Sequence, residues 1–182
     1  MNRNIIDYWV EMSIREVWTQ SHFAQIAYSH IDPKASNGTD LVFSSIHSFL
    51  SHSAMVSKML LAKSDDPSSK SIGDILGIPA TSLIHNRKFR NHLEHYDERL
   101  REWITQAAMG RSIGTYNVGP KSMIGIPNMI FVSHYDPTND IFTFVDEDFN
   151  LGELNLEIGK INRLADEWVK KVERRVIKPP FV

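Results

Sequence analysis

A short polar stretch of this chain carries side chains that could move a proton beside a phosphate. It reads RNHLEHYDERL and spans residues 90–100. Histidine is suited to proton transfer near neutral pH, and arginine holds a phosphate through its planar fork of donors. On a helix, His92, His95 and Arg99 fall along one flank because they are spaced three and four residues apart. These residue types are the minimum that cleavage of a phosphodiester without a metal requires.

The same residues also fit the polar edge of an ordinary helix. The helix predicted over 82–107 has a regular apolar stripe, formed by Phe89, Leu93, Tyr96, Leu100, Trp103 and Ala107. A histidine beside such a stripe often binds a backbone carbonyl, and charged side chains such as Glu94 and Glu98 often face water. The residues alone leave both interpretations open.

Other chemistries find no support in the sequence. His92 and His95 would supply two imidazoles within one turn, and a zinc ion needs further ligands. A di-iron site needs Glu-x-x-His on two helices, and that motif does not occur. The phosphate-binding loop, the dinucleotide-binding fingerprint and the hydrolase nucleophile elbow are absent too. We therefore expect no metal and no cofactor.

Four long helices are predicted to position the polar stretch of residues 90–100, which we call the strip. Apolar residues recur every three or four positions from Ile5 to about Ser29, and again from Thr39 or Asp40 to about Lys63. The third helix carries the strip. The last helix opens at Asn150, which forms a capping-box pattern with Glu153.

One β-hairpin is predicted before the last helix. β-Branched and aromatic residues dominate 126–136 and 141–149, and Pro137 and Asn139 suit the turn between them. The preceding segment is predicted to be irregular because glycines and a proline interrupt it. We therefore expect an all-α protein with a single domain over 1–182, a bundle of four long helices with a small β-hairpin at about 126–149.

Composition narrows the class of protein. The 182 residues carry a net charge of −2 and no cysteine, which gives no general attraction to nucleic acid or membranes, no thiolate zinc site and no disulfides. The N-terminal stretch lacks the apolar core of a signal peptide, and no stretch approaches the roughly 20 apolar residues of a membrane span. We expect a soluble protein of the cytoplasm without membrane contact.

The run Arg90-Asn91-His92-Leu93-Glu94-His95 resembles the R-x4–6-H motif of the HEPN superfamily, in which a polar residue commonly follows the arginine. The resemblance implies an all-helical bundle that forms a homodimer, with two motif helices facing one another across a composite cleft. Active members are metal-independent endoribonucleases, and some are toxins with an antitoxin partner. It therefore implies single-stranded RNA as substrate and an antitoxin or another protein as a partner.

Carried over to this chain, the resemblance assigns three catalytic residues. Arg90 would stabilise charge on the scissile phosphate, His95 would act as base or acid at the ribose 2′-hydroxyl, and Asn91 would orient the pair. The products would be a 2′,3′-cyclic phosphate and a 5′-hydroxyl. Three further residues are expected to contact substrate: Arg87, His92 and Arg99.

Two features of the strip depart from a simple catalytic helix. At about 100° per residue, Arg90 and His95 lie roughly 140° apart, so the helix must distort or the cleft must combine two subunits. Arg87 and His92 have the same spacing as Arg90 and His95. Some toxins carry a tyrosine two places after the histidine, whereas Tyr96 follows His95 directly. The alternative hypothesis is a catalytically silent helical module that binds a partner protein or a nucleotide.

Overall fold

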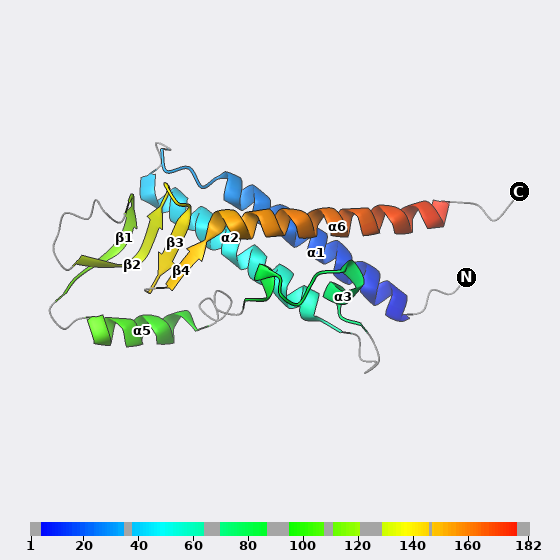
Figure 1. Ribbon diagram of the computed structural model, residues 1–182, viewed down its shortest axis with the longest axis horizontal. Helices are drawn as coiled ribbons and strands as arrows, with labels where there is room; N and C mark the ends of the chain where they lie inside the picture. The colour runs from blue at the N-terminus through cyan, green and yellow to red at the C-terminus, as the bar shows by residue number, and fades with distance from the viewer. Residues whose placement is uncertain are drawn as a thin grey trace, which may run out of the picture.

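Three long helices make up the body of the molecule: α1 (Ile5–Ser29), α2 (Gly38–Leu61) and α6 (Leu151–Ile177). The computed structural model describes residues 5–34, 38–63, 70–86, 95–107, 111–120, 129–145 and 147–177. α1 packs along both α2 and α6. Figure 1 shows a sheet at one end of these helices, with α5 (Tyr96–Ala107) set apart below it in the view. Among the residues described, none of the helices combines the length and apolarity that a membrane crossing requires.

The predicted spacing of apolar residues is confirmed for these three helices. Ile14 and Val17 of α1 and Ile158 of α6 are fully buried, and each lies on a stripe with a helical period. At the start of α6, the side chain of Asn150 accepts a hydrogen bond from the Glu153 backbone N–H at 3.0 Å, as the capping pattern predicts. A short helix, α3 (Ile72–Leu76), precedes Pro79.

The prediction of an all-α protein is wrong, because the chain contains a four-stranded mixed sheet. Its strands are β1 (Ser112–Val118), β2 (Met129–Asp136), β3 (Ile141–Phe144) and β4 (Glu147–Asn150), in that order across the sheet. β1 runs parallel to β2, and the other neighbours are antiparallel. The predicted hairpin is confirmed as β2 and β3, and the chain turns once more at Val145 to add β4.

β1 occupies the segment that was predicted to be irregular. Gly114 lies opposite Phe131 of β2, and a Cβ on this glycine would collide with the Phe131 ring. A glycine inside a strand often marks such a close approach. The glycines that suggested a loop are therefore compatible with a strand whose neighbour fills the missing side-chain space.

The third helix was predicted to begin near Ser82, and this start is wrong. Leu83–His85 forms a single 3₁₀ turn, and Asn86 after it is extended. The Ser82 hydroxyl donates to the carboxylate of Glu157 on α6 instead of capping a helix. The described helix is α5, which begins at Tyr96.

A polar junction ties α1 to the sheet and to the start of α6. The Asp140 carboxylate, in the turn between β2 and β3, accepts hydrogen bonds from Tyr28 at 2.6 Å and Tyr135 at 2.9 Å. The Leu151 N–H donates to the Asp140 carbonyl at 2.9 Å. Burial, together with the bond to Asp140, raises the pKa of Tyr28 to about 12 and also raises that of Tyr135.

Candidate functional site

The structure describes two of the six predicted site residues. Arg87, Arg90, Asn91 and His92 lie outside the described residues, so their placement relative to His95 stays a prediction. His95 is exposed and directly precedes α5, and its carbonyl accepts the first helical bond from the Arg99 N–H at 3.1 Å. Arg99 is half-buried in the first turns of the helix.

A carboxylate lies beside the His95 ring. Nδ1 of His95 lies 3.3 Å from Oε2 of Glu98, one turn along the helix. Both side chains are more than half exposed, so the pair lies in contact with solvent.

α5 holds His95 at its head through an amphipathic pattern. Trp103 is buried and Leu100 packs against the core cluster. α5 carries two arginines and three carboxylates, of which Arg99 is half-buried and the others are exposed: Arg101, Asp97, Glu98 and Glu102. The helix therefore presents a charged, nearly balanced surface beside His95.

A third histidine of the same region lies by a cavity of about 230 Å³. His85 ends the 3₁₀ turn, and Ser71 and Asp74 line the cavity with it. Nδ1 of His85 is buried and has no hydrogen-bond partner among the described residues. The Asp74 carboxylate is occupied in capping α3 with Ser71, so the cavity supplies no assembled acid–base pair.

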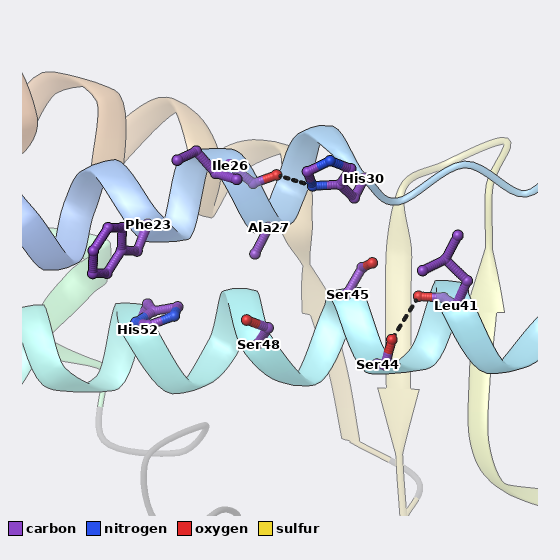
Figure 2. Close-up of a pocket in the computed structure, with 9 residues that line it drawn as sticks. All are labelled: Phe23, Ile26, Ala27, His30, Leu41, Ser44, Ser45, Ser48 and His52. Carbon is purple, nitrogen blue, oxygen red and sulfur yellow. Dashed lines mark hydrogen bonds between the residues drawn. The ribbon is translucent and has the colours of Figure 1, made fainter.

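The sequence did not reveal a groove between α1 and α2 (Figure 2). It measures about 380 Å³. Phe23, Ile26 and His30 line it from α1, and the α2 side carries serines and His52. We call the surface that lines this groove the α1–α2 face: Phe23, Ile26, His30, Ser44, Ser48 and His52. The signal that could have revealed it is the near absence of charge from α2.

Both histidines of the groove are oriented by their Nδ1 atoms. Gln20 donates its amide to Glu16 at 2.7 Å, so its oxygen faces Nδ1 of His52, also at 2.7 Å. Nδ1 of His30 lies 2.9 Å from the Ile26 carbonyl. In the part of the chain that is described, no group of three or more histidine and carboxylate side chains gathers where it could hold a metal.

The chain has no match among protein-family models, curated proteins or solved structures. Its function is therefore inferred from its own side chains.

Proposed function

We propose that the chain is a metal-independent endoribonuclease that acts on single-stranded RNA as a homodimer in the cytoplasm. The observation that carries this proposal is the exposed His95 imidazole, which lies beside Glu98 at the head of α5. General acid–base catalysis needs an imidazole that a substrate can reach, and the exposed ring of His95 supplies one. The resemblance of residues 90–95 to the HEPN motif supports the choice of RNA.

The proposed reaction needs no cofactor. Nε2 of His95 removes the proton from a ribose 2′-hydroxyl, and the oxygen attacks the adjacent phosphorus. The bond from phosphorus to the 5′-oxygen breaks, and that oxygen takes up a proton. Arg90 stabilises the charge on the phosphate, Asn91 orients the reacting groups, and Arg87, His92 and Arg99 hold the RNA backbone.

Glu98 acts in this scheme as a positioning residue. Its carboxylate fixes which ring nitrogen of His95 is protonated and stabilises the imidazolium that forms during proton transfer. A carboxylate this close to a polyanion also repels it. The strip therefore suits a short RNA segment held by arginines better than a long duplex.

The test incubates mixed-sequence single-stranded RNA in EDTA with the wild type and with His95→Ala, Arg90→Ala and Glu98→Gln. General acid–base groups contribute about 10²–10⁴-fold to rates, so His95→Ala should lose at least about 100-fold. Glu98→Gln should lose less. Arg101→Ala, on the same helix, is the matched control and should cleave normally. Cleavage unchanged by His95→Ala and Arg90→Ala would sink the proposal.

The α1–α2 face favours a second candidate function, that of a catalytically silent module for binding a partner protein such as an antitoxin. Exposed apolar side chains that adjoin one another commonly mark protein contacts. If the wild type is folded and dimeric yet cleaves no RNA, the silent module is the better account.

A further inference from the structure

The cavity beside His85 lies where the end of α2, the short helix α3 and the 3₁₀ turn meet. α3 packs against the end of α2, and Figure 1 shows the two beside each other. The Ile72 N–H donates to the Ala62 carbonyl at 3.1 Å, which joins the two segments at the cavity. Pockets for drug-sized ligands commonly measure about 300–1,000 Å³. At about 230 Å³, this cavity admits only a small molecule.

The lining of the cavity is part apolar and part polar: Leu60, Leu61, Ser71, Gly73, Asp74, Ile78, Ala80 and His85. One polar atom of this lining, Nδ1 of His85, is buried and bonded to none of the residues that the structure describes. Leaving a buried polar atom without a partner costs free energy, so nearly all such atoms are paired with protein or with a bound molecule. A ligand in the cavity would supply the missing hydrogen bond.

The Asp74 carboxylate offers a second unused position. Ser71 donates to Oδ2 of Asp74 from its N–H at 3.1 Å and from its hydroxyl at 2.7 Å. Both bonds end on Oδ2, so Oδ1 stays available to a ligand while the carboxylate is held in one orientation. The bonds from Ser71, together with the nearby charges of Lys63 and Lys70, lower the pKa of Asp74. The carboxylate is therefore ionised at neutral pH.

Two exposed lysines flank this carboxylate. Lys70 directly precedes Ser71, and Lys63 directly follows Ala62, the residue bonded to α3. Like charges repel, so the lysines disfavour a metal ion or a simple amine beside Asp74. Asp74 in turn disfavours a simple anion beside the lysines. A small molecule that carries both charges on neighbouring atoms is complementary to all three side chains.

We propose that this cavity binds a free α-amino acid with a short apolar side chain. The ammonium group donates to Oδ1 of Asp74, and the carboxylate lies toward Lys63 and Lys70. The charged end of the ligand also supplies the bond that Nδ1 of His85 lacks, and its side chain packs on Ile78 and the other apolar lining residues. A peptide keeps its terminal charges further apart and does not fit. This inference depends neither on the ribonuclease nor on its dimer.

Calorimetric titration of the full chain tests the need for both charges. The probes are L-alanine, L-valine and L-leucine, and two analogues that keep the apolar body of leucine. Leucinamide lacks the carboxylate, and 4-methylpentanoate lacks the ammonium group. At least one of the amino acids should bind, and each analogue should bind at least about tenfold more weakly than leucine. No binding of any amino acid at millimolar concentration, or equal binding of leucine and both analogues, overturns the proposal.

Variants of the lining test the assigned contacts. Asp74→Asn keeps the shape of the side chain and removes its charge, and His85→Phe keeps a ring and removes the nitrogen. Each should weaken leucine binding at least about tenfold. Glu167→Gln, at an exposed position on α6, removes one negative charge elsewhere and should leave binding unchanged. Circular dichroism confirms that each variant is folded, and wild-type affinity in Asp74→Asn overturns the assignment.

The lysines provide a test that does not touch the interior. Lys63→Gln combined with Lys70→Gln changes two exposed side chains, so the fold is retained. The double variant should bind leucine more weakly, because the ligand carboxylate loses its partners. It should bind leucinamide more tightly, because repulsion of the ammonium group is removed. A change in the same direction for both ligands overturns the placement of the carboxylate. RNA cleavage is assayed separately, so its absence contradicts the ribonuclease and leaves this site standing.

Discussion

The inner and outer sides of the α1–α2 pair differ in what covers them. On the inner side, Phe49 is fully buried and the Tyr28 hydroxyl is bonded to Asp140. On the outer side, Phe23 and Met55 are more than 40% exposed. Both sides carry large apolar side chains, so apolarity alone does not identify the core. Cover from α6 and the sheet identifies the core, and the outer side lacks that cover.

The largest expected effect contrasts two phenylalanines. Truncating a buried phenylalanine costs about 3–5 kcal/mol, so Phe49→Ala should lower the free energy of unfolding by that amount. Phe23→Ala should change it by less than about 0.5 kcal/mol, measured by urea unfolding at concentrations where the chain is monomeric. Equal losses in the two variants would erase the distinction between the sides.

The next effect concerns the polar junction on the inner side. Asp140→Ala leaves the hydroxyls of Tyr28 and Tyr135 without their acceptor, which should cost about 1–3 kcal/mol. Asp140 has a φ of 54°, a region that asparagine tolerates, so Asp140→Asn keeps one acceptor oxygen and should lose less. Thermal unfolding of both variants measures the difference, and an equal loss would argue against the hydrogen bonds.

A smaller effect tests how tightly that junction is packed. Alanine normally stabilises a helix by up to about 1 kcal/mol over glycine. A Cβ on Gly152 would lie 2.8 Å from Oδ2 of Asp140, so Gly152→Ala should forfeit this gain and lower the stability slightly. Gly159→Ala on the same helix meets only the amide of Gln25 at 3.3 Å and should gain. A gain in stability in both variants would mean that Asp140 moves aside for the new methyl group.

The smallest effect is a pH dependence from His47, which lies against the Phe142 ring at 6.1 Å. Burial lowers the pKa of this imidazole in the folded chain. Below the unfolded pKa of about 6.5, the unfolded chain therefore binds a proton that the folded chain binds less readily. Stability should fall as the pH drops through this range, and His47→Phe should flatten that part of the profile. An unchanged profile would place the titrating group elsewhere.

Much of the helical body could be predicted, because apolar residues at a helical period indicate the face that a helix buries against its neighbours. Met12 and Trp18 lie on the apolar stripe predicted from the sequence, yet both are exposed. Spacing identifies the face and not its cover, which is why the α1–α2 face was missed. β1 was missed because Gly114 lacks the side chain that a strand pattern needs, and its space is filled by Phe131.

The candidate site could be predicted only as a set of residue types. The sequence singled out His95, but it did not show that Glu98 lies beside its ring. The carboxylate that lies beside the ring depends on the residue at which α5 begins, and sequence patterns do not fix the ends of a helix to the residue.

The position of β1 at the edge of the sheet predicts how fast its amide protons exchange with solvent. β1 is paired on one side, to β2, and most of its residues are exposed, whereas β2 lies between two strands and its second half is buried. Amide protons of β1 should therefore exchange with solvent when its pairing with β2 opens. Those of β2 should exchange only when a larger part of the sheet unfolds. We therefore expect amide exchange to be faster in β1 than in β2, through brief openings of β1 that leave the helical body folded.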